Sequence, residues 1–89
     1  MSCVAALGCS GAPVQEMSNA RQAIRAARDA GAERAAPQIL TEAQALLEQA
    51  EASLQKRSYR EAKRNAVSAR SKAAEALGAA QPAFVDRKG

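Results

Sequence analysis

Apolar side chains recur three and four positions apart in this chain, and most of them are alanine. In segment 58–78 they form one uninterrupted series: Tyr59, Ala62, Ala66, Ala69, Ala73 and Ala76. Residues at this spacing share one face of an α-helix, whereas a half-buried strand would need apolar and polar residues to alternate. The pattern therefore predicts an all-α fold, with an almost purely alanine face on the helix at 58–78.

Two earlier segments have the same periodicity. The expected inward face of residues 14–30 consists of Val14, Met17, Ala20, Ile24 and Ala27. That of residues 38–56 consists of Leu40, Ala43, Leu47, Ala50 and Leu54, widened by Ile39 and Leu46. Short connections between such helices make neighbouring helices antiparallel. We therefore expect a three-helix antiparallel bundle, or a set of helical hairpins, as one helical domain over residues 14–80.

Glycine and proline mark the boundary between the first two helices. Gly31 can adopt the left-handed conformation that ends a helix at little cost. Pro37 fits the first turn of the second helix, where its missing N–H is no loss. Residues 32–36 between them are expected to form a short connection.

The third helix has a start signal and a stop signal of its own. Ser58 and Glu61 have the capping-box spacing, at which each side chain accepts a hydrogen bond from the backbone N–H of the other residue. Gly78 and Pro82 should end the helix, so residues 81–89 are expected to form a disordered tail.

Alanine supplies 24 of the 42 hydrophobic residues, so large apolar side chains are few and the core should be thin. Small side chains let helix axes approach more closely than the usual ~8–10 Å, which favours tight packing of the third helix on the second. The net charges of the helical segments also favour mutual packing, at +1 for 14–30, −1 for 37–57 and +3 for 58–78. A chain with so thin a core should gain stability from a second copy or another partner.

The N-terminal run Ala6-Leu7-Gly8-Cys9 resembles the lipobox of bacterial lipoproteins, in which the signal peptide is cut before a cysteine that then carries lipid. The resemblance implies that residues 1–8 end a signal peptide, that Cys9 is the lipid attachment site, and that residues 9–13 form a disordered tether. Residues 1–8 contain no Lys or Arg, and a secretory signal needs a basic start and an apolar core of roughly 7–15 residues. Either the signal begins upstream of Met1, or the motif is accidental.

Three motifs in the helical part resemble a family of alanine-rich bacterial envelope lipoproteins that is catalogued as a domain of unknown function. They are Gly31-Ala32, Ala36-Pro37 and Ser58-Tyr59-Arg60-Glu61-Ala62. The resemblance covers roughly residues 9–80, and members often carry this domain ahead of an OmpA-like peptidoglycan-binding domain. It implies a helical fold and an outer-membrane lipoprotein facing the periplasm, with the membrane, a second copy or an envelope protein as partner. It implies no biochemical activity.

A basic cluster near the start of the third helix is the one candidate binding site, comprising Arg57, Arg60, Lys63 and Arg64. Positions 57, 60 and 64 are spaced to share a helical face that could neutralise phosphates. We do not expect nucleic acid, because no aromatic platform is interleaved with the charges. Lipid headgroups or wall polymers are the polyanions of an envelope. The alternative is that these charges are solvated and pair with glutamates of the second helix.

Residues for catalysis or metal binding do not form a recognisable pattern. There is no histidine, so the serines lack their usual base and the commonest metal ligand is missing. There is no glycine-rich phosphate loop either. We expect no enzymatic activity, no cofactor and no metal. The expected function is a lipid-anchored structural or interaction module of the bacterial envelope. The alternative is a soluble cytoplasmic helical adaptor that binds a partner protein or polyanion through its basic third helix.

Overall fold

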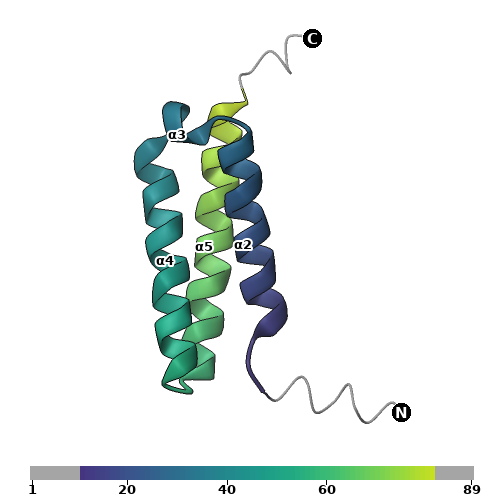
Figure 1. The fold of residues 1–89 in the computed structure, drawn as a ribbon, viewed down its shortest axis with the longest axis vertical. Helices are drawn as coiled ribbons and strands as arrows, with labels where there is room; N and C mark the ends of the chain where they lie inside the picture. Colours follow the sequence, from purple (N-terminus) through teal and green to yellow (C-terminus); the bar gives the residue numbers. More distant parts are fainter. Residues whose placement is uncertain (1–10, 82–89) are drawn as a thin grey trace, which may run out of the picture.

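The computed structural model describes residues 11–81. Its helices are α2 (Val14–Asp29), α3 (Ala32–Ala35), α4 (Pro37–Gln55) and α5 (Tyr59–Ala80), and no strand occurs within these residues. The three long helices lie side by side and alternate in direction, which confirms the expected antiparallel bundle (Figure 1). The predicted signal peptide, Cys9 and all of the predicted tail after Gln81 lie outside the described residues.

The corner between α2 and α4 contains a helical turn that the sequence did not predict. Gly31 has φ +95° and reverses the chain, as expected of a glycine at a helix end. Residues 32–36 were expected to be a plain connection, but Ala32–Ala35 form α3 and bury Ala32. Ala36 then leaves the helical region at φ −147°, which suits a residue before proline, and Pro37 begins α4 as predicted.

The predicted capping box at the start of α5 does not form, because Ser58 makes no side-chain hydrogen bond to the helix. Its backbone instead helps to end α4. The Ser58 N–H donates to the Ser53 carbonyl (2.8 Å), and the Arg57 N–H donates to the Leu54 carbonyl (2.9 Å). This is the Schellman pattern, in which the residue past the helix end adopts a left-handed conformation. Arg57 occupies that position, with φ +64°.

Helix α5 supplies the centre of the core. Its alanine series is fully buried over Ala62, Ala66, Ala69, Ala73 and Ala76, each with 0% exposure. It packs against both α2 and α4, while α2 and α4 make fewer contacts with each other. One buried cluster near α3 includes Ile24 and Leu40. A second cluster toward the opposite end includes Met17.

Some residues of the predicted inward faces are less buried than expected. Val14 is 69% exposed and Tyr59 is 37% exposed, because each is the first residue of its helix. Leu47 and Leu54 are only partly buried, and Ser53 is buried beside Leu54. Since α5 lies against both other helices, the buried stripe of α4 is turned toward α5, and the side that faces α2 stays partly open.

Candidate interaction surfaces

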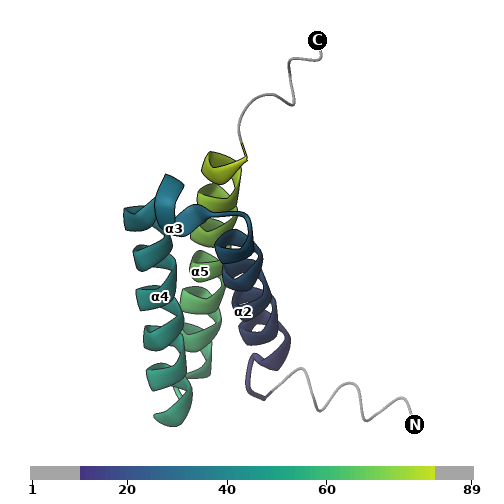
Figure 2. The same ribbon diagram turned by 45° about the horizontal axis from the view of Figure 1, so that its top comes forward.

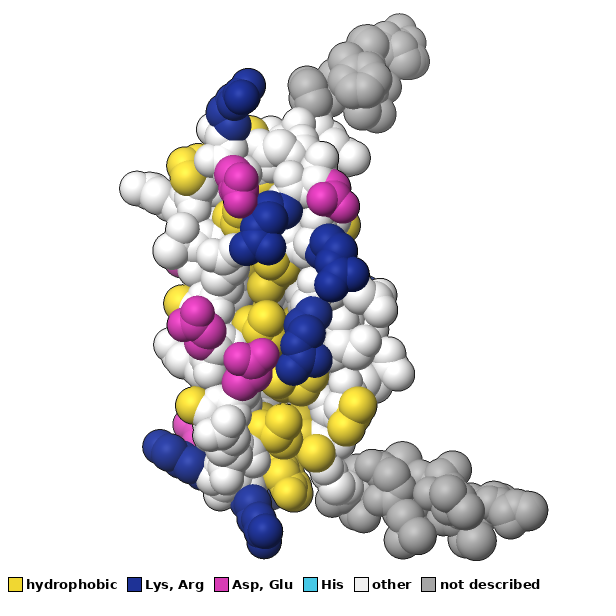
Figure 3. All heavy atoms as spheres, viewed as in Figure 1, with side chains coloured by type: hydrophobic (Ala, Val, Ile, Leu, Met, Phe, Trp, Pro, Cys, Tyr) yellow, Lys and Arg dark blue, Asp and Glu magenta, His cyan; other side chains and the backbone are white. Residues whose placement is uncertain are grey.

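A groove of about 450 Å³ runs between α2 and α4. Ile24 and Leu47 are its apolar residues. Figure 3 shows hydrophobic side chains along the middle of this face, with acidic side chains on the α4 side and basic ones on the α2 side. The charged lining residues are Arg21, Arg25 and Arg28 from α2, and Glu48 and Glu51 from α4.

Ion pairs connect α4 to both of its neighbours. Arg21 Nη2 lies 3.3 Å from Glu51 Oε2 across the groove, and Lys72 Nζ lies 3.2 Å from Glu42 Oε1 on the other side of α4. The hydrogen bond to Glu42 and its negative charge raise the pKa of Lys72 above 10.5, with a further contribution from the charge of Glu75. The pairs join the acidic middle helix to its two basic neighbours, as the segment charges predicted. Exposed pairs of this kind contribute little stability individually.

The basic cluster occupies the turn between α4 and the start of α5, but its members do not share one helical face. Arg57 precedes α5 in a left-handed conformation, while Arg60, Lys63 and Arg64 belong to the first turns of α5. All four side chains are exposed. Arg60 and Arg64 line a hollow of about 440 Å³ together with Ser58, Tyr59 and Glu61.

The glutamates of α4 pair with other residues than these. Within residues 11–81, Glu51 pairs with Arg21 and Glu42 pairs with Lys72, and no ion pair involves any of the four basic side chains. Within the described part of the chain, the alternative interpretation is therefore wrong about pairing with α4 and right about the solvation of the cluster. Its charges face solvent.

The whole net charge of the protein is concentrated in residues 56–64, which we call the basic end. This segment contains five basic residues, Lys56 included, and one acidic residue, Glu61, so its net charge is +4. The chain has 13 basic and 9 acidic residues, which leaves eight of each sign elsewhere. The charges of the remainder therefore cancel. A sequence window centred on this turn could have shown the concentration, whereas division by helices spread it over two segments.

The polypeptide enters the bundle at this same end. The start of α2 and the turn between α4 and α5 lie together at one end, and α3 and the end of α5 lie at the other (Figures 1 and 2). Cys9 precedes Val14, the first residue of α2, by five positions. Five residues of extended chain span at most roughly 17 Å, so the start of α2 lies within that distance of Cys9.

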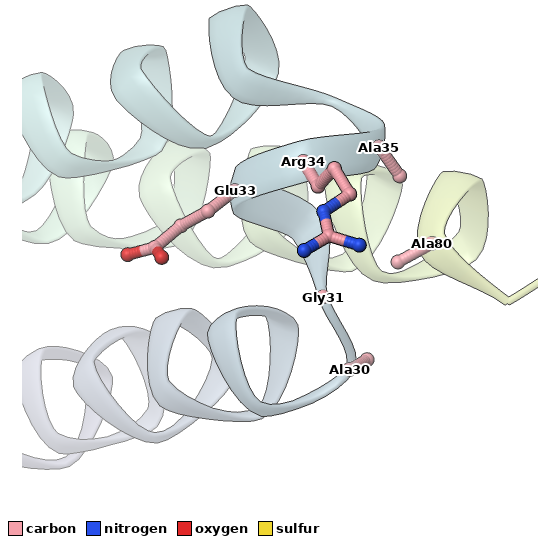
Figure 4. A pocket seen from close by; sticks show the side chains of 6 residues that line it. All are labelled: Ala30, Gly31, Glu33, Arg34, Ala35 and Ala80. Atoms are coloured by element: carbon pink, nitrogen blue, oxygen red, sulfur yellow. The ribbon is translucent and has the colours of Figure 1, made fainter.

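A third hollow, of about 670 Å³, lies at the opposite end, lined by Ala30, Gly31, Glu33, Arg34, Ala35 and Ala80. Figure 4 shows the Arg34 side chain extending over it, while Glu33 points away from Arg34. The Glu33 carboxylate instead accepts a hydrogen bond from Arg28 Nε at 3.2 Å, which ties α2 to α3 across the Gly31 corner. Alanine and one arginine dominate this lining, and both charged residues belong to α3.

Residues 11–81 contain no group of three or more His, Cys, Asp or Glu side chains arranged to hold a metal ion. None of the helices α2 to α5 is long and apolar enough to cross a membrane.

Comparison with known proteins gives one match. Residues 15–83 match the family described as Domain of unknown function (DUF4398), a range that spans all four helices. No curated protein and no solved structure matches the chain.

Proposed function

Since the chain belongs to the family Domain of unknown function (DUF4398), we propose a function from its own residues and geometry. The protein is a lipid-anchored structural or interaction module of the bacterial cell envelope, without catalytic activity. Cys9 carries the lipid, and the helical bundle projects from the membrane surface. By its resemblance to envelope lipoproteins that precede OmpA-like domains, it faces the periplasm from the outer membrane.

The observation that carries the proposal is the coincidence of two features at one end of the bundle. The chain enters α2 there, five positions after a cysteine preceded by Ala6-Leu7-Gly8, and the entire net positive charge is at the same end. Attachment of lipid to Cys9 keeps the start of α2, which lies at this end, within roughly 17 Å of the lipidated residue. Anionic lipid would attract the end that the anchor presents.

Metabolic labelling with palmitate tests the anchor. The protein is expressed from its natural gene with the native upstream sequence, as wild type, Cys9→Ala and Cys3→Ala. We expect label in the wild type and in Cys3→Ala, because Cys3 precedes the proposed cleavage point and leaves with the signal peptide. Cys9→Ala should lose the label and leave the membrane fraction. Label that persists in Cys9→Ala, or that is absent from the wild type, would refute the anchor.

The thin core supports the interaction part of the proposal. Eleven of the fourteen buried hydrophobic residues in the described range are alanine. A second copy or an envelope protein that binds the folded state would add stability by mass action. The melting temperature should then rise with protein concentration if the partner is a second copy. A concentration-independent melting temperature, together with a monomeric mass in sedimentation, would refute self-association.

A further inference from the structure

We propose that the basic end binds the anionic headgroups of a lipid bilayer, so that the anchored bundle stands end-on against the membrane. The inference deepens the proposed function, since lipid on Cys9 is what brings this end to the surface. The headgroup contacts would come chiefly from Arg57, Arg60, Lys63 and Arg64.

The four charges lie close to one plane at the tip of the bundle. Arg57 is in the turn, and Arg64 is the sixth residue of α5. At a rise of 1.5 Å per residue, Arg64 lies only about 8 Å along the axis from the start of the helix. Long basic side chains can extend past the helix end, so all four ammonium or guanidinium groups can reach one surface.

Because salt screens charges over short distances, the basic end is the part of the protein whose charges interact most strongly with the membrane. The Debye length is about 10 Å at 0.1 M salt, and the anchor holds the start of α2 within roughly 17 Å of Cys9. Helix α5 has 22 residues and is about 33 Å long, so charges at the α3 end lie several Debye lengths away. The net charge of all residues outside 56–64 is zero, so the remainder of the chain adds no net attraction to an anionic surface.

The basic side chains of this end are available to an external anion. Arg21, Arg28 and Lys72 each pair with a carboxylate, whereas within residues 11–81 the four side chains of the basic cluster have none within 4.0 Å. The carboxylates near this end are Glu61, in the first turn of α5, Glu16, in the first turn of α2, and Glu51, in the last turns of α4, which pairs with Arg21. They leave a clear positive excess.

Exposed apolar surface is found at the same end. Three large hydrophobic residues are exposed in the described range, and two of them, Val14 and Tyr59, are the first residues of α2 and α5. Tyrosine is enriched at membrane interfaces, where its ring contacts the acyl boundary and its hydroxyl stays hydrated. An apolar residue and a tyrosine beside basic side chains suit a bilayer surface better than a purely aqueous polyanion.

Vesicle co-sedimentation with the full chain tests the inference. The protein carries Cys9→Ser, so that no lipid is attached, and the vesicles contain phosphatidylcholine with or without phosphatidylglycerol. We expect binding only when phosphatidylglycerol is present, and weaker binding as salt rises. Equal binding to both vesicle types, or to neither, would overturn the proposal.

Two triple variants with the same net charge distinguish the effect of where the basic residues lie from the effect of the protein's total charge. One carries Arg60→Gln, Lys63→Gln and Arg64→Gln. The control carries Arg25→Gln, Arg34→Gln and Arg70→Gln, three exposed arginines that form no ion pair within residues 11–81. Each triple lowers the net charge from +4 to +1.

Because each basic residue near an anionic surface contributes about 1 kcal/mol, the first triple should lose affinity on the order of a hundred-fold. The control should change only a few-fold. Equal losses in the two triples would mean that binding follows total charge, and would overturn the assignment to the basic end.

Arg57→Gly gives a variant that should keep the fold. Glycine is preferred at the left-handed position of Arg57, so the variant should melt at a higher temperature while losing vesicle affinity several-fold. If affinity instead stays at the wild-type level in this variant, Arg57 does not contact headgroups. If an oligonucleotide outcompetes the vesicles at equal phosphate concentration, the ligand of the basic end is nucleic acid and not lipid.

The outcomes keep this inference separate from the proposed function. Palmitate labelling reports the anchor and does not depend on the basic end. Vesicle binding of the Cys9→Ser chain reports the basic end and does not depend on the anchor. Labelling without vesicle binding would support the lipid-anchored module and refute the headgroup contact.

Discussion

Substitution of Ala66 by leucine tests the close packing on which the fold depends. Ala66 is 0% exposed and belongs to the buried cluster that contains Met17 and Ala20 of α2 and Ala50 of α4. Both neighbouring helices therefore contribute to its surroundings, and three added carbon atoms can be accommodated only if a helix moves. Overpacking of this kind costs about 1–3 kcal/mol.

The assay is thermal unfolding followed by circular dichroism. For a domain of this size, a loss of 1 kcal/mol lowers the melting temperature by roughly 4–8 °C, so Ala66→Leu should melt at least about 4 °C below the wild type. Ala74→Leu is the matched control, because it makes the same change on the same helix at an exposed position. It should cost only the few tenths of a kcal/mol that separate the helix propensities of leucine and alanine. If the two variants have the same melting temperature, or Ala66→Leu has the higher one, the alanine face of α5 is not tightly packed in solution.

Two further predictions concern α4. Leu40 is 3% exposed, so Leu40→Ala should cost about 2–5 kcal/mol in urea unfolding, whereas Leu47→Ala in the partly open groove should cost clearly less. Equal costs would mean that α2 covers Leu47 in solution. Glu42→Gln should lower the pKa of Lys72 toward 10.5, as measured by NMR titration of the side chain, because Glu42 is the largest cause of its rise. An unchanged pKa in the variant would contradict the pairing. Since the pKa of Lys72 is raised in the folded state, any stabilisation from the pair should be complete below pH 10.5 and should disappear as the pH rises through the folded-state pKa.

The sequence alone was enough to locate the long helices, because helix periodicity depends mainly on near neighbours along the chain. The predicted stop at Gly78 was wrong, since α5 continues through it to Ala80. The alanine series of α5 is buried from Ala62 to Ala76 as predicted, and Gly31 and Pro37 act where the sequence placed them. Each of these assignments required only residues within a few positions of one another.

The sequence could not decide between two local hydrogen-bonding patterns that compete at Ser58, and the structure was needed to show which one forms. Ser58 has the spacing for a capping box with Glu61, yet its backbone closes the end of α4 by donating to Ser53. That choice turns Arg57 into the left-handed residue of the turn and removes it from the helical face predicted for positions 57, 60 and 64. The two motifs compete for the Ser58 N–H, which the capping box would donate to the Glu61 carboxylate and which here donates to the Ser53 carbonyl.

The arrangement of the helices decided what local pattern could not. An apolar stripe indicates that a helix has an inward face, but which flank of the stripe is covered depends on where its neighbours lie. Because α5 contacts both α2 and α4, Ser53 is buried while Leu47 and Leu54 are left partly exposed. The same arrangement brings the start of α2 beside the basic turn, although Val14 and Arg57 are 43 positions apart in the chain. Sequence determined the helices and the concentration of charge in residues 56–64, and tertiary packing alone brought that segment to the end where the chain enters the bundle.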